Sequence, residues 1–265
     1  MNRADYHLHT LLCHHAVGTP ADYARAAVAK GLEEIGFADH NPMPTPFDDW
    51  RMSIEDLPRY LELVQEARAK FPQLKIRLGL ECDFIAGREA WIEKLAGMAD
   101  WDFLIGSVHY IAPGWAVDNP EFIGKFRERP VAEIWEMYWK IYEQCIRSGL
   151  FDFVAHPDLP KKFGFKPETD LERFYAPSIA ALAEKKIAVE INTAGLRKPI
   201  AELYPNRAFL EMAHAAAVPL LINSDAHAPE EVGADFAAAT KLAHDVGYRE
   251  VVRFEKRKRR FVSLE

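Results

Sequence analysis

The chain has 265 residues, of which 49% are hydrophobic and 28% are charged, enough to bury a sizeable core as one α/β barrel domain. Its formal net charge of −7 argues against a nucleic-acid-binding surface, because contacts to a phosphate backbone need clustered Lys and Arg. The first residues lack the apolar stretch of a secretory signal and no later segment is apolar enough to cross a membrane, so we expect a cytoplasmic protein with no membrane or nucleic-acid partner.

Short apolar runs alternate along the chain with amphipathic segments, a pattern typical of repeated βα units. The predicted strands lie near Asp5–His9, Glu34–Ala38, Lys75–Glu81, Phe103–His109, Phe151–His156, Ala188–Asn192 and Pro219–Asn223. The predicted helices lie near Pro20–Lys30, Ser53–Lys70, Arg88–Ala99, Pro130–Ser148, Leu171–Lys185, Ala201–Ala216 and Pro229–Val246. Because right-handed crossovers return each strand beside the previous one, this alternation indicates a parallel α/β barrel. No repeat or linker divides the chain, so we expect a single domain over residues 1–265.

The cysteines and the one basic run fit structural roles. Cys13, Cys82 and Cys145 are odd in number and lack CxxC spacing, so we expect small buried side chains rather than a disulfide framework or a zinc knuckle. The basic run at Lys256–Arg260 is expected to form a solvated turn before a last short strand.

Metal-binding or amide side chains end each predicted strand. The stretches that show this pattern are DYHLH, GFADH, RLGLE, LIGSVH, DFVAH, VEIN and LLINSDAH. In a parallel barrel the carboxyl ends of all strands form one face, where barrel enzymes place their chemistry. We therefore expect these residues, distant in sequence, to converge.

His7 and His9 lie two residues apart on a predicted strand, so both side chains project from one side and can hold one ion. Asp225 and His227 repeat this spacing. An HxH pair alone is a weak signal and is more often an ordinary surface or core feature. Several imidazoles and carboxylates buried together without a cation would be costly to desolvate, which favours a metal cluster. The nine candidate ligands are His7, His9, His15, His40, Glu81, His109, His156, Asp225 and His227.

Nine donors exceed the needs of one tetrahedral ion and indicate two or three ions with bridging groups. Imidazoles with two carboxylates suit zinc, iron or manganese better than magnesium or calcium, and the sequence does not choose among the three. Only one of the adjacent His14 and His15 is expected to be a ligand. Asp5 and Asp39 are expected to accept hydrogen bonds behind the ligands, although Asp39 could instead cap a turn.

Taken together, these motifs resemble those of the polymerase and histidinol phosphatase (PHP) family of metallo-phosphoesterases over essentially the whole chain. The similarity rests on DYHLHT, ADHNP, GLECDF, GSVHYI, AHPDL, EINTAG and NSDAH. The resemblance implies a distorted seven-stranded parallel barrel, similar to a TIM barrel, that hydrolyses phosphomonoesters with metal-activated hydroxide. Within the family, GLECDF, GSVHYI and WAVDNPEF are most similar to members that convert L-histidinol phosphate to L-histidinol and phosphate in histidine biosynthesis.

The resemblance also implies how the ligands divide among two or three divalent metals. The first set is His7, His9, Glu81 and Asp225; the second is Glu81, His109 and His156; the third is His15, His40 and His227. The neighbouring His14 leaves the register of the early loop open, and with it the third set. Asp225 or His227 could also assist departure of the leaving group.

Contacts to the substrate are expected from the loops beyond the strands. Arg197 is the predicted phosphate clamp, because guanidinium matches two phosphate oxygens at once; otherwise it is a solvated surface residue. Lys161 or Lys162 would add a second positive charge or be solvated. The predicted partners of the substrate's ammonium and imidazole groups are Asp83, Phe84 and Asp118.

Two other functions stay open at this point, and a metal-free barrel that uses the histidines as buried polar groups is a third possibility. One is a PHP phosphoesterase that acts on nucleotides or nucleic-acid ends, which the acidic charge counts against. The other is a non-catalytic barrel with structural metals, although such sites are usually closed by four protein ligands and would not need nine. The sequence leaves the oligomeric state open.

Overall fold

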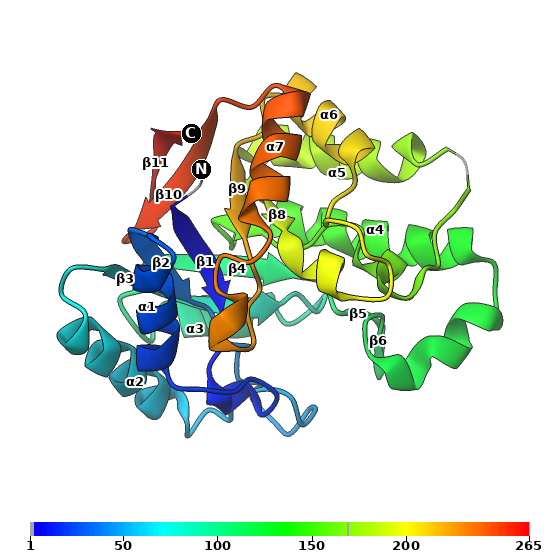
Figure 1. The fold of residues 1–265 in the computed structure, drawn as a ribbon. Coiled ribbons are helices and arrows are strands. Elements are labelled where there is room, and N and C mark those ends of the chain that lie inside the picture. The colour runs from blue at the N-terminus through cyan, green and yellow to red at the C-terminus, as the bar shows by residue number, and fades with distance from the viewer. Residues whose placement is uncertain (1–2, 169, 265) are drawn as a thin grey trace.

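The computed structural model describes residues 3–168 and 170–264 and contains one parallel barrel. Its sheet has the order β1-β2-β3-β4-β7-β8-β9, so each strand pairs with the barrel strand before it (Figure 1). The strands are β1 (Ala4–Leu8), β2 (Glu34–Phe37), β3 (Lys75–Asp83), β4 (Phe103–Ser107), β7 (Phe153–Val154), β8 (Ala188–Asn192) and β9 (Leu220–Asn223). This order confirms the predicted parallel barrel.

The barrel closes through the residues that follow β9. Leu8 and Ala226 form a single parallel bridge, and the backbone of Ala226 exchanges 3.0 Å hydrogen bonds with His7 and His9. The register between β1 and β2 also shifts between Asp5 and Leu8. The barrel is therefore distorted on the β1 side, where the HxH pair lies.

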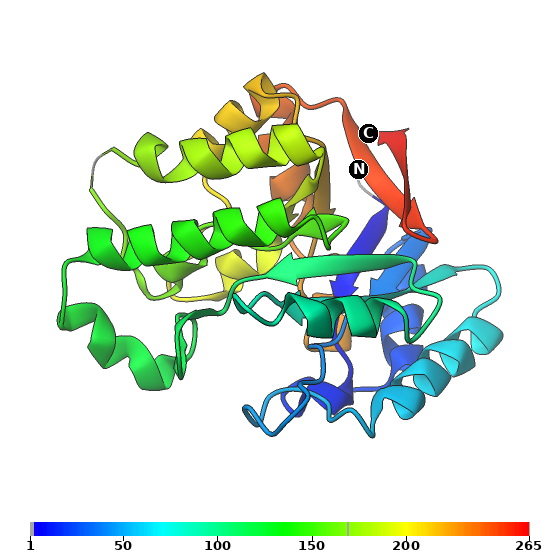
Figure 2. The ribbon, with the colours of Figure 1, turned by 180° about the vertical axis from the view of Figure 1, so that it is seen from behind.

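Helices cover the outside of the sheet, and α4 and α5 pack side by side in both views (Figures 1 and 2). Their bounds are α1 (Pro20–Ala29), α2 (Leu57–Lys70), α3 (Glu89–Ala96), α4 (Val131–Ser148), α5 (Glu172–Lys185), α6 (Arg207–Ala215) and α7 (Phe236–Val246). Local sequence explains where α1 begins, because Thr19 and Asp22 form a reciprocal capping box there. At the end of α4, Gly149 adopts a φ of 70°, which favours glycine.

Short 3₁₀ helices follow several barrel strands and shape the loops at the carboxyl face. They are η1 (Leu11–Cys13), η2 (Pro120–Arg127), η3 (Leu159–Phe163), η4 (Thr193–Arg197) and η5 (Pro229–Glu231). None was predicted as a separate element, because their few residues carry no hydrophobic period long enough to detect.

Two predicted helices begin six or seven residues later than expected, the largest such differences. The helix expected from Ala201 is α6, which begins at Arg207 because Asn206 caps it by accepting the backbone N–H of Phe209. The helix expected from Pro229 is divided: η5 ends at Glu231, and Gly233 and Asp235 then adopt positive φ angles before α7 begins.

Two antiparallel hairpins were not predicted. β5 (Tyr110–Ala112) pairs with β6 (Trp115–Ala116), and β10 (Glu250–Glu255) pairs with β11 (Lys258–Ser263). The basic run therefore forms a turn at Lys256 and Arg257 and continues into β11, which agrees with the expected turn and last strand. In Figure 1 this hairpin, drawn in red, lies beside the amino end of β1.

The interior of the barrel is filled by aromatic rings. The ring of Phe103 lies 5.2 Å from Tyr6 and 5.7 Å from Phe153, and Phe254 of β10 lies 5.7 Å from Phe153. A Cβ atom at Gly79 would lie 2.2 Å from the Phe103 ring, so this strand position has to be glycine. Phe254 thus extends the interior cluster beyond the seven strands and covers the amino end of the barrel.

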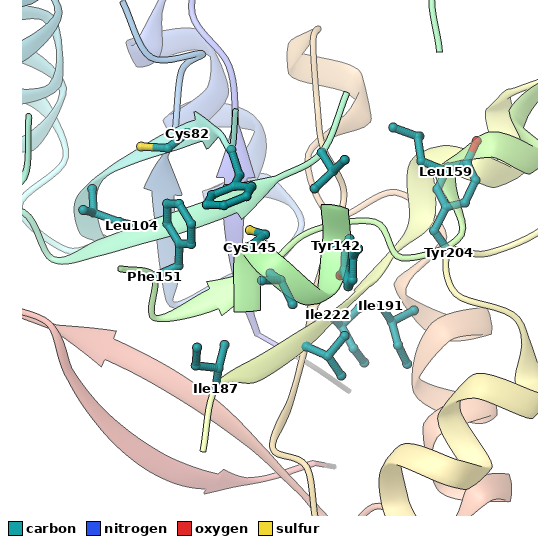
Figure 3. Packing of buried hydrophobic residues seen from close by; sticks show 14 of the residues in the cluster. Cys82, Leu104, Tyr142, Cys145, Phe151, Leu159, Ile187, Ile191, Tyr204 and Ile222 are labelled. Atoms are coloured by element: carbon teal, nitrogen blue, oxygen red, sulfur yellow. The ribbon is translucent and has the colours of Figure 1, made fainter. Parts of the chain in front are cut away.

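A second, larger core lies between the strands and the helices. Figure 3 shows part of it, with Cys82, Leu104, Cys145 and Phe151 packed together. All three cysteines are buried and free, as expected. Within the described ranges, no helix is both long and apolar enough to span a bilayer.

Candidate metal centre

The predicted ligands come together at the carboxyl ends of the barrel strands. His7 and Glu81 lie on β1 and β3. His15 follows the end of β1 by seven residues, and the other candidates follow their strands by one to four residues. His40 also pairs with Glu81 through a parallel bridge that continues the β2–β3 register. All of the candidates except the fully buried His7 and His9 line a cavity of about 340 Å³. The expected convergence is therefore present in the structure.

Glu81 lies at the centre of the cluster and is only 1% exposed. Its two carboxylate oxygens face different imidazoles. Around Oε2 the distances are 2.9 Å to His40 Nδ1, 3.3 Å to His7 Nε2 and 3.5 Å to His9 Nε2. Around Oε1 they are 3.0 Å to His156 Nε2, 3.7 Å to His109 Nε2 and 2.6 Å to Ser107 Oγ. One carboxylate can therefore bridge two ions.

Three groups of potential ligand atoms, each with all atoms within 4.8 Å of one another, correspond to the three expected sets. They are His7, His9 and Glu81; then Glu81, His109 and His156; then His15, His40 and His227. Asp225 Oδ1 extends the first group, because it lies 3.2 Å from His9 Nε2. His14 faces away, with its Nδ1 2.9 Å from the carbonyl oxygen of Asp49. The arrangement favours His15 over His14.

Carboxylates lie behind three of the imidazoles and orient them. Nδ1 of His7 lies 2.9 Å from Glu190 Oε1, and Nδ1 of His109 lies 2.7 Å from Asp83 Oδ1. The Nδ1 of His9 lies 3.5 Å from Asp39. This leaves each Nε2 facing the centre of the cluster, the usual arrangement behind metal-binding histidines.

Glu190 belongs to this outer layer and was not predicted as a site residue. It is fully buried on β8 and accepts hydrogen bonds from the side-chain amides of Asn192 and Asn223 at 2.9 and 2.8 Å. An acidic residue inside the apolar VEIN run was the available signal. By contrast, Asp5, expected in this role, accepts from Ser224 and Gly233 and joins β1 to the segment after β9.

The charges of the cluster are strongly coupled. Burial raises the pKa of Glu81, but the imidazoles of His40 and His7 outweigh it and hold that pKa well below the usual range. Burial lowers the pKa of His40 to about 4. Burial would also lower the pKa of His109, but Asp83 raises it to about 9. The site thus favours ionised carboxylates, the form that binds cations.

The donor set fits transition-metal ions. Several buried atoms aimed into the cluster make no hydrogen bond to any described residue: Nε2 of His7, His9 and His227, Nδ1 of His40, and Oε2 of Glu81. Buried polar atoms of this kind are costly unless a cation satisfies them. Mixed imidazole and carboxylate donors suit zinc, iron or manganese.

Two of the predicted substrate contacts, Asp118 and Lys162, line the cavity. Lys162 donates through Nζ to the carbonyl and carboxylate oxygens of Asp118, at 2.7 and 3.1 Å. Asp225 and His227, the predicted catalytic pair, line it as well.

The four other predicted contacts lie outside the cavity lining, and their placement corrects those predictions. Lys161 is buried and bonded to the carbonyl of Leu203, while Asp83 is buried between an arginine and His109. Phe84 belongs to the hydrophobic core.

Arg197, the predicted phosphate clamp, is likewise engaged elsewhere. Its guanidinium donates to the carbonyl of Ser224 at 2.7 Å and to the carboxylate of Glu231 at 3.2 Å. It therefore ties the loop after β8 to the loop after β9. The adjacent Lys198 lines the cavity instead.

Trp50 lines the cavity and was not predicted. Its ring lies edge-on to the rings of His40 and His109, with centroid separations of 4.7 and 5.4 Å. It belongs to the irregular segment between β2 and α2, where no periodic pattern indicates which side chains face the site.

Comparison with known proteins gives consistent matches. The PHP domain matches residues 5–194. A Deinococcus radiodurans protein named "Probable histidinol-phosphatase" is 46% identical, with 96% of this chain and 97% of that protein covered. The Bacillus subtilis "Histidinol-phosphatase" is 29% identical, with 90% of this chain and 98% of that protein covered.

Solved structures match the fold. The histidinol phosphate phosphatase of Lactococcus lactis, solved with zinc, L-histidinol and phosphate, superposes with a TM-score of 0.84 at 24% identity. The match covers 98% of this chain and 99% of the Lactococcus chain. It supports the distorted barrel architecture.

Proposed function

The chain belongs to the PHP domain family, and from this premise we propose that it is a metal-dependent phosphomonoesterase that hydrolyses L-histidinol phosphate to L-histidinol and phosphate. The reaction belongs to histidine biosynthesis. We propose that residues 1–265 act as one domain, because the nine ligands span β1 to the segment after β9 and no part of this range completes the site alone.

The observation that carries the proposal is the position of Glu81 among five imidazoles, at 2.9–3.7 Å. Bound divalent transition metals would supply Lewis acidity toward phosphoryl oxygens and lower the pKa of water. The three ligand sets are proposed to hold two or three such ions, with Glu81 shared between the first two. Zinc, iron and manganese all fit these donors.

The chain's own residues bind the substrate and handle its protons. Lys162 and Lys198 provide positive charge at the cavity wall for the phosphate group. Asp118 provides a carboxylate for the substrate's ammonium. Asp225 and His227 line the same cavity and are the residues that we propose to assist departure of the leaving oxygen.

The test is phosphate release from L-histidinol phosphate, measured beside nucleotide and sugar phosphates, with metal content determined on the same sample. We expect a strong preference for histidinol phosphate and two or three bound metals. Bound metals with a preference for another phosphate ester would defeat the substrate proposal while leaving the metallo-phosphoesterase intact. Absence of bound metal together with absence of turnover would defeat both.

A further inference from the structure

Arg51 is a buried arginine in the irregular segment between β2 and α2, and it is 5% exposed. Its guanidinium donates from Nη2 to Asp83 Oδ2 at 2.7 Å, and from Nε and Nη2 to the carboxylate of Asp48 at 2.7 and 2.6 Å. Nη1 donates to the carbonyl of Asn41 at 3.0 Å. All three nitrogens of the side chain are therefore engaged.

Asp83 connects this arginine to the metal centre. One carboxylate oxygen accepts from Arg51, and the other lies 2.7 Å from Nδ1 of His109. The backbone N–H of Asp83 donates to Asn41 Oδ1 at 2.9 Å, which fixes the base of the side chain. Because both of its oxygens have partners, the carboxylate of Asp83 cannot rotate freely. It therefore holds the ring of His109 with Nε2 toward Glu81.

The two other carboxylates behind ligand imidazoles have different partners. Glu190 is held by the side-chain amides of Asn192 and Asn223. Asp39 is held by the hydroxyl of Thr10 and by backbone N–H groups. Among these three carboxylates, within the described ranges, only Asp83 is bonded to a guanidinium. A charged donor forms a stronger hydrogen bond to a carboxylate than a neutral donor does, and the two bonds to Asp48 fix the guanidinium that makes it.

We infer that Arg51 is a positioning residue that acts through Asp83 to hold His109 in the geometry needed for the second metal set. This inference rests on the metal centre of the proposed function. Arg51 itself does not line the cavity, but its guanidinium lies 4.4 Å from the ring of Trp50, which does. The same side chain thus supports one metal ligand and one wall of the site.

The test compares the metal affinity of purified Arg51→Met with that of the parent, by titration with zinc against a competing chelator and by elemental analysis. We expect the affinity of one zinc site to fall about 10- to 100-fold, as for loss of other outer partners of metal ligands. The zinc affinity of Arg51→Lys should lie between those of the parent and Arg51→Met, because an ammonium keeps the charge but cannot bond Asp48 and Asp83 with a planar fork. In steady-state kinetics at low zinc, kcat should fall while KM changes little, and excess zinc should restore kcat.

Arg253→Met is the matched control, because Arg253 is also buried and paired with an acidic residue, Glu34, at the opposite end of the barrel. It should keep the parental zinc affinity. A folded Arg51→Met protein with parental zinc affinity would overturn the inference.

A double variant tests the route of the effect. Arg51→Met added to Asp83→Asn should cause no further loss of zinc affinity, and full additivity would overturn the route through Asp83. If Arg51→Met does not fold, the zinc affinity of Arg51→Lys, measured alone and in the Asp83→Asn background, still tests the inference. A parent that binds zinc but leaves L-histidinol phosphate intact would defeat the proposed substrate alone.

Discussion

The two ends of the barrel each bury a glutamate, but they neutralise it differently. At the amino end, Glu34 is fully buried and is bonded by Arg77 at 2.6 Å, by Arg260 at 3.0 Å and by the hydroxyl of Tyr6 at 2.7 Å. At the carboxyl end, Glu81 faces imidazoles and the hydroxyl of Ser107, with no guanidinium among its partners in residues 3–168 and 170–264.

This difference separates structural charge from functional charge. Guanidinium is charged at every accessible pH, so the amino end is complete without any added ion. Imidazole binds a metal only in its neutral form, so at the carboxyl end a bound cation would take over the charge compensation from protonated imidazoles such as His109. Aromatic packing under the hairpin closes the first end, whereas the second keeps an open cavity.

Replacing the buried glutamate at each end by glutamine should give the largest contrast in activity. Glu81→Gln should lower kcat/KM by about 10³-fold or more, because it removes the shared ligand and several kcal/mol of metal-assisted stabilisation. Glu34→Gln, the same change at the amino end, should retain kcat per folded molecule and lose stability. Steady-state kinetics and thermal unfolding of both proteins check this. Near-parental turnover of Glu81→Gln would contradict the assigned centre.

Removing the ring that closes the amino end should affect only stability. Phe254 is 2% exposed and stacks on Phe153, so Phe254→Ala should cost about 3–5 kcal/mol of unfolding free energy. Denaturant titration measures the loss, and kcat at a temperature where the variant stays folded should be unchanged. A fall in kcat without a fall in stability would show that the two ends are coupled.

Chelation should affect both activity and stability through the carboxyl end. Dialysis against a metal chelator should abolish turnover, and zinc, iron or manganese should restore it. Metal at about 100 times its dissociation constant would stabilise the fold by about 2.7 kcal/mol, which corresponds to roughly 5–10 °C in the melting temperature. Calorimetry of the chelated and reloaded protein checks the shift. The Glu81→Gln variant should show a smaller shift.

The two adjacent lysines after β7 are expected to show the smallest effects, one on activity and the other on stability. Lys162 lines the cavity, so Lys162→Met should lower kcat/KM for the phosphate ester about 10-fold with little loss of stability. Lys161 is buried against Asp158 and Leu203, so Lys161→Met should chiefly destabilise the fold. Kinetics paired with thermal unfolding separates them. A loss of kcat/KM in Lys161→Met and not in Lys162→Met would instead indicate that Lys161 contacts the phosphate.

The residues of the metal centre could be predicted from the sequence because barrel topology relates strand ends in a simple way. His7, Glu81 and His156 are far apart in the chain, yet each ends an apolar run, and parallel strands bring such ends to one face. The two-residue spacing of His7 and His9 placed both on one side of a strand.

The substrate contacts could not be predicted in the same way because they lie on loops. Arg197 and Lys198 are neighbours, but the 3₁₀ turn of η4 directs the arginine to Ser224 and leaves the lysine at the cavity. A periodic pattern does not specify side-chain directions in such short turns. The sequence could therefore predict the metal ligands but not the other residues that line the cavity.

The sequence by itself determined the strand order, the ligand types and the face on which they meet, since all three follow from apolar periodicity and parallel topology. Only the tertiary structure decided which charged groups are already paired: Arg51 with Asp83, Arg197 with Glu231, and Lys161 with Asp158. The physical reason is that the partners of these three side chains hold them away from the cavity, whereas Lys162, although it is paired with Asp118, still lines it. The partners of Arg51 and Arg197 come from distant segments, and Lys161 also reaches the carbonyl of Leu203, so these pairings depend on tertiary packing.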